Sequence, residues 1–151
     1  MKVELVGFSQ MVNVHGDPMS LAELAASVCY DSKPTKNCSI VKQCIASGHL
    51  SVLEHVSFTF HIEGISRACL AQLSRHRHIS LSVRSQRYCR EDNFRYVNPF
   101  PDGSYGARVF ESYMEDARGN YVDMVDAGVA PEDARAVLPN ACCTEPSFFR
   151  S

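Results

Sequence analysis

The segment from residue 75 to residue 88 concentrates the side chains of this sequence that are best suited to bind an anion. It opens with Arg75-His76-Arg77 and reaches Ser85 after seven further residues, with Arg87 two positions later. Each guanidinium group offers a planar fork of N–H donors that matches phosphate oxygens, and the serine adds a hydroxyl. Apolar and polar residues alternate over residues 79–84, which predicts a half-buried segment. We therefore expect an anion- and cofactor-binding element of an enzyme that acts on a nucleotide.

The same arginines have two other interpretations. The helix predicted over residues 65–75 points its C-terminal end at them, and cations are electrostatically favoured there, so one of them could be purely structural. A second hypothesis is an arginine-rich nucleic-acid-binding module. The formal net charge of −2 and the lack of a basic stripe elsewhere in the sequence argue against that module.

Two further groups of polar residues could contribute to a site. His49, Ser51 and Glu54 come just before the most regular strand pattern of the sequence, residues 55–63. At that position they could orient a ligand. His55 is explained equally well as a hydrogen-bonded residue at the strand end. Arg135 lies on a short segment that otherwise consists of packing residues.

Composition bounds the class of protein. The 151 residues suit one domain with a core of its own, and 45% hydrophobic and 21% charged residues are typical of globular chains. No apolar run approaches the roughly 20 residues that cross a bilayer, and the N-terminus has no signal-peptide layout. We expect a cytoplasmic protein with no membrane or nucleic-acid partner. Seven cysteines without CxxC spacing indicate free thiols in a reducing compartment.

A metal site is a further hypothesis, because histidines stand at positions 49, 55, 61, 76 and 78. Their spacing lacks a compact pair with a third ligand and carboxylate support. We therefore expect no metal.

Hydrophobic periodicity predicts helices and strands in mixed order. Strands are expected at residues 1–8 and 55–63, and a polar, turn-rich loop at residues 89–103. A long helix is expected over residues 104–127, with Val109, Tyr113 and Tyr121 among its apolar positions. The remaining helices are expected at residues 21–30, 37–47, 65–75 and 131–138.

In their order along the chain, these motifs resemble the flavin-dependent thymidylate synthases. That family is marked by Arg-His-Arg, seven residues and Ser, which Arg75-His76-Arg77 and Ser85 match, and the motif continues to Arg87 and Tyr88. A Gly-His-x-Ser-x-x-Glu-His element is matched over residues 48–55. An Ala-Arg-x-Val-Leu-Pro element is matched over residues 134–139. The resemblance thus covers nearly the whole chain.

The resemblance implies the reductive methylation of dUMP to dTMP. Methylenetetrahydrofolate would give the carbon, FAD would carry the hydride and NADPH would reduce the flavin, while the protein supplies binding and electrostatics. It implies catalytic roles for His49, Arg75 and His76. It implies FAD binding by Ser51, Glu54, Arg75, His76 and Arg77, and dUMP binding by Gln72, Ser85, Arg87 and, from a neighbouring subunit, Arg135. A homotetramer with shared active sites is implied as well.

The fold that the resemblance implies is an α/β (α+β) domain over residues 1–151, with a small, mostly antiparallel sheet flanked by helices. The chain departs from the family at two places. Ser82 and Val83 stand where many members have Asn and Glu, which removes a possible polar contact to a ligand. From Glu145 onward the family's strand and helices are not continued, so we expect a truncated or frameshifted end at residues 145–151. The alternative to an active synthase is then an inactive homologue that keeps partial nucleotide or flavin binding.

Overall fold

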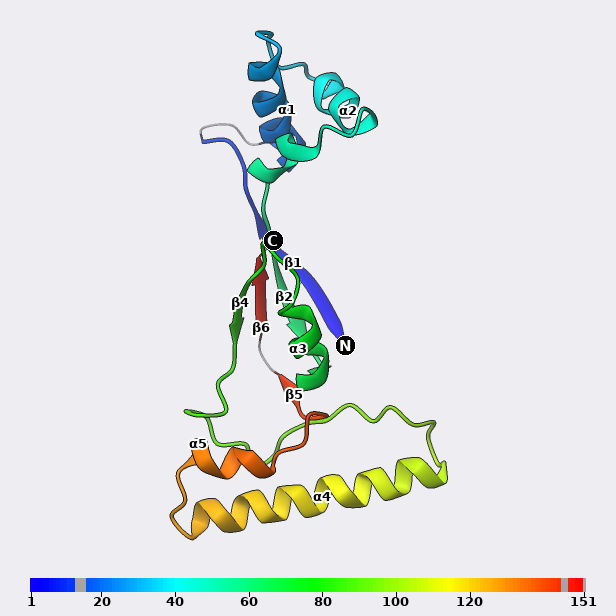
Figure 1. Ribbon diagram of the computed structural model, residues 1–151, viewed down its shortest axis with the longest axis vertical. Helices are drawn as coiled ribbons and strands as arrows, with labels where there is room; N and C mark the ends of the chain where they lie inside the picture. The colour runs from blue at the N-terminus through cyan, green and yellow to red at the C-terminus, as the bar shows by residue number, and fades with distance from the viewer. Residues whose placement is uncertain (13–15, 145–146, 151) are drawn as a thin grey trace. The chain divides into compact units, whose positions relative to one another are not determined.

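The computed structural model describes residues 1–12, 16–144 and 147–150, and Figure 1 shows its elements. The chain forms two compact units. The first unit holds Met1–Glu4 and His61–Phe149, and the second unit holds Leu5–Phe60 with the end of the chain from Arg150. The expectation of an altered end concerns residues 145–151, and residues 145, 146 and 151 lie outside the described residues.

Helices and small sheets alternate along the chain. Strands β1 (Lys2–Phe8), β2 (Phe58–Glu63), β6 (Ser147–Arg150) and β4 (Ser80–Val83) form a four-stranded sheet in that order. Strand β3 (Ile65–Ser66) pairs antiparallel with β5 (Cys143–Thr144). The helical elements are α1 (Pro18–Cys29), α2 (Ser39–Ala46), η1 (Leu50–His55), α3 (Arg67–Leu73), α4 (Tyr105–Asp126), α5 (Pro131–Ala134) and η2 (Arg135–Val137). The expected mixture of helices with small, mostly antiparallel sheets and one long helix in the second half is confirmed.

The second unit has a small apolar core between α1, α2 and η1. Ala22 and Ala26 lie one turn apart on α1, and they pack with Val41 and Cys44 of α2 and Val52 of η1. Helix α1 begins where it does because the carboxylate of its N-cap, Asp17, accepts a hydrogen bond from the backbone of Ser20 at 2.9 Å, and because proline follows at the first position. Through its packing in this core, Val52 anchors η1 to both α1 and α2.

A buried carboxylate ties α1 to the start of α2. Helix α2 has no side-chain cap of its own, since its N-cap residue, Cys38, is left-handed with φ 52°. Glu23 of α1, 1% exposed, takes that role by accepting hydrogen bonds from the backbone of Val41 at 2.8 Å and of Thr35 at 3.0 Å. Burial raises the pKa of Glu23, but hydrogen bonds from Thr35 and from the first turn of α2 outweigh it, so the pKa is lowered.

The first unit is organised along α4. Its N-cap, Ser104, accepts a hydrogen bond from the backbone of Ala107 at 3.1 Å. Its buried positions are Ala107, Met114, Ala117 and Tyr121, a single stripe at helical spacing. Met114 packs with Phe94 and Cys142. Gly106 lets Phe100 approach, because a Cβ at that position would lie 2.9 Å from the phenylalanine ring.

Several element boundaries differ from those expected. The strand expected from residue 55 begins at Phe58, because the residues before it form η1. The helix expected from residue 65 begins at Arg67, since Ile65–Ser66 pairs with β5 instead. The helix expected at residues 131–138 is divided into α5 and η2. On α4, Val109 and Tyr113 are exposed, at 51% and 58%, whereas Tyr121 is buried.

No helix in the described part of the chain is both long and apolar enough to cross a membrane.

Candidate functional site

The second unit presents His49, Ser51 and Glu54 on the turn formed by η1. All three side chains are exposed, whereas Val52 between them is buried. The turn is entered through Gly48, whose φ of 77° favours glycine, and the backbone N–H of His49 donates to the carbonyl of Cys44 at 2.8 Å. Residues three apart in a 3₁₀-helix eclipse one another, so Ser51 and Glu54 lie on the same side of η1. A hydroxyl and a carboxylate are therefore offered together to a ligand.

The first unit presents Arg75-His76-Arg77 directly after α3. The backbone N–H groups of Arg75 and His76 still donate to the carbonyls of Gln72 and Leu73, both at 3.1 Å, so the segment continues the last turn of the helix. The three side chains are exposed, as is that of Gln72. Among the described residues, none hydrogen-bonds or ion-pairs with the side chains of Arg75, His76 or Arg77. These cationic and imidazole groups are thus open to an anionic ligand, in addition to any favourable effect on the helix end.

Ser85 and Arg87 lie on a tight turn that follows β4. The Ser85 hydroxyl accepts from the backbone N–H of Arg87 at 3.2 Å, and the Ser85 carbonyl accepts from the N–H of Cys89 at 3.0 Å. On β4 itself Ser82 is exposed and Val83 is half-buried, as the alternating pattern predicted. A serine that closes its own turn places its hydroxyl next to the backbone N–H groups, which is an arrangement that phosphate oxygens can use.

Arg87 and Arg135 meet at Glu132 of α5. Arg87 donates through Nη2 to the Glu132 carboxylate at 3.0 Å, and Arg135 donates through Nε to the Glu132 carbonyl at 3.0 Å. Arg135 and Gln86 also line a cavity of about 480 Å³ together with Glu132 and Asn140. Within one chain, Glu132 therefore links these two arginines.

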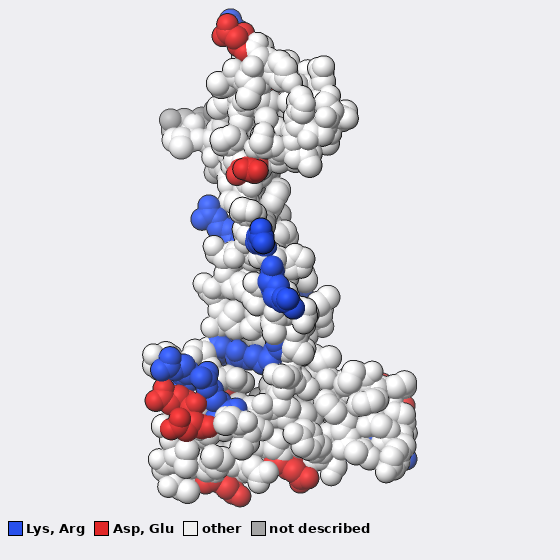
Figure 2. Space-filling model, in the orientation of Figure 1, with Lys and Arg blue, Asp and Glu red and all other residues white. Residues whose placement is uncertain are grey.

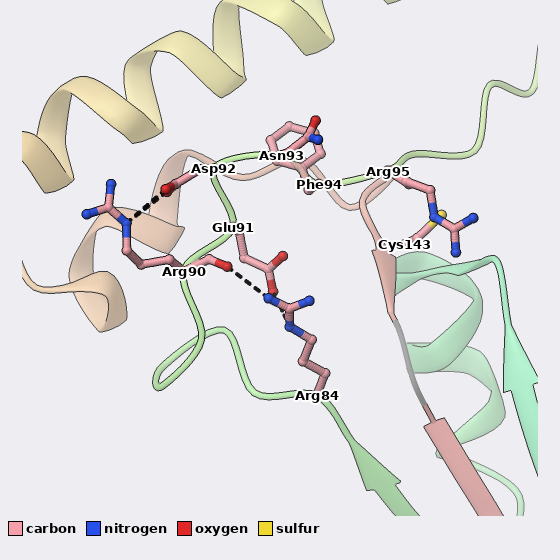
Figure 3. A pocket seen from close by; sticks show the side chains of 8 residues that line it. All are labelled: Arg84, Arg90, Glu91, Asp92, Asn93, Phe94, Arg95 and Cys143. Atoms are coloured by element: carbon pink, nitrogen blue, oxygen red, sulfur yellow. Dashed lines mark hydrogen bonds and ion pairs between the residues drawn. The ribbon is translucent and has the colours of Figure 1, made fainter.

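The sequence did not predict a charged cluster, consisting of Glu91, Arg84 and Arg67, next to the Ser85 turn. Glu91 is 7% exposed, and Figure 3 shows its carboxylate facing the guanidinium group of Arg84, with 3.6 Å between Nε and Oε1. Arg67, at the start of α3, donates through Nη2 to the Arg84 carbonyl at 2.9 Å. The sequence signal that could have marked Arg67 is a lone cation within an apolar helical pattern. Glu91 lies in the polar segment expected as a loop, where no pattern marks a buried residue.

Burial and charge act against each other in this cluster. Burial lowers the pKa of Arg67, and the nearby Glu91 carboxylate opposes that change. Burial likewise raises the pKa of Glu91, opposed by Arg84 and Arg67. Burial raises the pKa of the Cys142 thiol to about 11, and Glu91 adds to the effect. The Cys142 thiol is therefore held in its protonated form at physiological pH, which is the less reactive form.

A cavity of about 450 Å³ opens beside the cluster. Its lining is mixed in charge, with Arg84, Arg90 and Arg95 next to Glu91 and Asp92 (Figure 3). Arg90 is already committed to Asp92 and Asp126, both at 3.0 Å. This cavity is consequently less cationic than its arginines alone would suggest.

The charge pattern also bears on the alternative functions. On the face drawn in Figure 2, basic and acidic groups adjoin near α5. The formal net charge of −2 gives the nucleic-acid hypothesis no general electrostatic support. Within the described residues, no group of three or more His, Cys, Asp or Glu side chains is arranged to hold a metal ion.

Comparison with known proteins resolves the family. The family model of the thymidylate synthase complementing proteins matches residues 10–147. The chain belongs to this family. The family resemblance inferred from the motifs at residues 48–55, 75–88 and 134–139 is thereby confirmed.

Curated relatives in this family are named flavin-dependent thymidylate synthases. The relative from Geobacter sulfurreducens is 44% identical over 146 residues, which are 85% of this chain and 62% of that protein. The relative from Mycobacterium avium is 37% identical over 145 residues, which are 81% of this chain and 58% of that protein. The chain thus spans about three fifths of the length of these relatives.

Solved structures confirm the fold. A flavin-dependent thymidylate synthase from Helicobacter pylori, crystallised with FAD and dUMP, superposes with a TM-score of 0.72 at 23% sequence identity. The match covers 99% of this chain and 78% of that one. A second structure of the Helicobacter pylori enzyme with the same two ligands gives a TM-score of 0.74.

Proposed function

We propose that this chain catalyses the reductive methylation of dUMP to dTMP, with methylenetetrahydrofolate as carbon donor, FAD as hydride carrier and NADPH as reductant. The observation that carries the proposal is the exposed Arg75-His76-Arg77 segment, whose side chains have no partner among the described residues, in a chain of this family. Curated relatives are named for the activity, and their solved counterparts were crystallised with FAD and dUMP.

The residues proposed to hold FAD fit its chemistry. A pyrophosphate needs cationic fork donors, which Arg75 and Arg77 supply, and ribose or ring edges need groups such as those of Ser51 and Glu54. When bound, the flavin supplies the hydride. His76 joins the arginines in binding, and His49, Arg75 and His76 are the groups we propose next to the reacting atoms. We propose that residues 1–151 belong to one catalytic domain.

The residues proposed to hold dUMP centre on the Ser85 turn. The Ser85 hydroxyl and neighbouring N–H groups would receive phosphate oxygens, with Arg87 as the fork donor. Gln72 and Arg135 complete the set, Arg135 from a neighbouring subunit of a homotetramer. Since Arg87 donates to Glu132 through Nε and Nη2, the phosphate would compete with that carboxylate for these donors.

A single preparation tests this proposal. The purified chain should carry a bound flavin visible in its absorption spectrum, bind dUMP, and release tritium from labelled dUMP when the folate and NADPH are present. Flavin and dUMP binding without tritium release would instead favour the second candidate, a homologue that binds but does not turn over. A folded protein that binds neither ligand would refute both.

The remaining proposals concern assembly and location. A homotetramer should elute from size-exclusion chromatography at four times the chain mass of 16.8 kDa. We also propose a cytoplasmic location, supported by seven cysteines without disulfide-like spacing, which suit a reducing compartment.

A further inference from the structure

The Ser85 turn is closed at its base by two guanidinium groups. Arg84 donates through Nη2 to the carbonyl of Arg90 at 2.9 Å, which joins the two ends of the loop formed by residues 84–90. Arg67 donates to the carbonyl of Arg84 at 2.9 Å, which ties the beginning of the same loop to α3. The geometry of Ser85 and Arg87 therefore depends on where these two guanidinium groups are held.

Glu91 is the negative charge that both of these arginines share. Its carboxylate lies 3.6 Å from Nε of Arg84, and it interacts electrostatically with Arg67. Its own backbone is fixed as well, because its N–H donates to the buried hydroxyl of Tyr121 on α4 at 3.2 Å. Glu91 is thus tethered to α4 through its backbone N–H, and its charge acts on two arginines that bond to the two ends of the loop.

We propose that Glu91 is a positioning residue that holds the Ser85–Arg87 loop in its ligand-binding geometry through Arg84 and Arg67. What the loop binds rests on the function proposed above, whereas the positioning itself does not. Without the charge of Glu91, Arg84 and Arg67 should still be able to bond to the loop carbonyls, but no shared negative charge would hold their guanidinium groups in place. The loop should then open more often and should bind dUMP less tightly.

The exposure of Arg84 explains why the effect of replacing Glu91 should be local. Its partner Arg84 is 40% exposed, so water can solvate that guanidinium group when Glu91 is replaced with an isosteric amide, and we expect the fold to stand. Glutamine keeps the volume of Glu91 and one of its two acceptor oxygens but loses its charge. The variant Glu91→Gln therefore separates loop position from overall stability.

Amide hydrogen exchange measures loop position directly. In Glu91→Gln we expect the amides of residues 85–90 to exchange about ten- to a hundredfold faster than in the wild type, as loss of a bond to a charged group produces. The amides of residues 50–56 in the second unit should be unchanged. The matched control is Glu115→Gln, which removes an exposed carboxylate paired with Arg118 and should alter neither segment. Unchanged exchange at residues 85–90, or a rise of equal size in both units, would overturn the proposal.

The dUMP dissociation constant supplies a second readout that a purely structural role would not move. We expect it to rise about tenfold in Glu91→Gln, at unchanged flavin content. Faster loop exchange with no dUMP binding by the wild type would keep Glu91 as a positioning residue and refute the substrate. Equal dUMP affinity in both proteins would refute the positioning role in binding.

The pH dependence distinguishes the charge of Glu91 from its shape. The groups that face it are Arg67, Arg84, the neighbouring Asp92, the Tyr121 hydroxyl and the Cys142 thiol. As the pH falls and Glu91 takes up a proton, the wild type should come to resemble the amide variant. The ratio of the two dUMP dissociation constants, in which the titration of the phosphate cancels, should then fall toward one. A ratio that stays constant with pH would show that charge is not what matters.

Discussion

Each unit contains a buried glutamate, and the two carboxylates are held in opposite ways. Glu23 in the second unit accepts hydrogen bonds from backbone N–H groups at 2.8 and 3.0 Å, and these lower its pKa although burial would raise it. Glu91 in the first unit faces a guanidinium group at 3.6 Å, and burial prevails, so its pKa is raised. Short bonds from fixed donors offset desolvation, whereas a longer ion pair does not.

The comparison separates scaffold from site. Glu23 caps α2 and so builds the frame on which the exposed residues of η1 are carried. Glu91 holds a loop whose side chains are proposed to bind substrate. Burial disfavours the ionised form of Glu91, so its charge adds little to stability, and the role that we propose for it is to position the loop.

The largest effect should come from Glu23→Gln. The amide has one oxygen in place of two, and its NH₂ group would face the donors of Thr35 and of α2. We expect a loss of about 2–4 kcal/mol in the free energy of unfolding, since several buried N–H groups lose their acceptor. Urea denaturation followed by circular dichroism measures it. Glu91→Gln should cost less than about 1 kcal/mol in the same assay, because its partner Arg84 is 40% exposed and stays solvated. Equal losses would abolish the contrast between the two glutamates.

The apolar anchor of η1 should matter next. Val52→Ala removes two methyl groups from the core between α1 and α2 and should cost about 1–2 kcal/mol. Amides of η1 should exchange faster as a result, while those of residues 85–90 stay as they are. Thermal unfolding with hydrogen exchange tests both statements, and faster exchange at residues 85–90 would show that the two regions are not independently held.

The two glutamates should give stability opposite dependences on pH. The lowered pKa of Glu23 means that its contribution is complete above the ordinary carboxyl value of 4.5 and is lost as the pH falls through its folded pKa. The raised pKa of Glu91 means that stability declines as the pH rises from 4.5 through its folded pKa. Denaturation midpoints of each glutamine variant and the wild type, compared across this acid range, should differ in opposite senses. A common sense for both would contradict the assigned directions.

The smallest effect should come from Glu132→Gln. Its pair with Arg87 is half-exposed, so stability should change by less than about 1 kcal/mol. Because Arg87 is released, dUMP affinity should rise slightly. Calorimetric titration of dUMP measures the change, with Glu115→Gln as the control. A weakened affinity would indicate that Glu132 aligns Arg87 for the substrate.

Local pattern predicted much of the fold because it depends on neighbours in sequence. The period of two around Phe58–Glu63 and the long helical stripe ending at Tyr121 were readable, as were the motifs that carry the family. Of η1, only His55 was expected as strand, because the alternation of residues 55–63 was extended too far toward its start. The face of α4 was only partly readable, since Val109 and Tyr113 are apolar yet exposed.

The sequence by itself determined which side chains are available for chemistry and in what order they occur. Arg75-His76-Arg77, Ser85 and the residues around His49 follow from composition and spacing alone. Only the tertiary structure decided which charges neutralise one another. Arg87 pairs with Glu132 and Arg84 with Glu91 because α5 and the segment after the Ser85 turn are brought there by packing on α4. The strength of a charge interaction depends on distance and burial, and neither quantity is written in the spacing of residues along the chain.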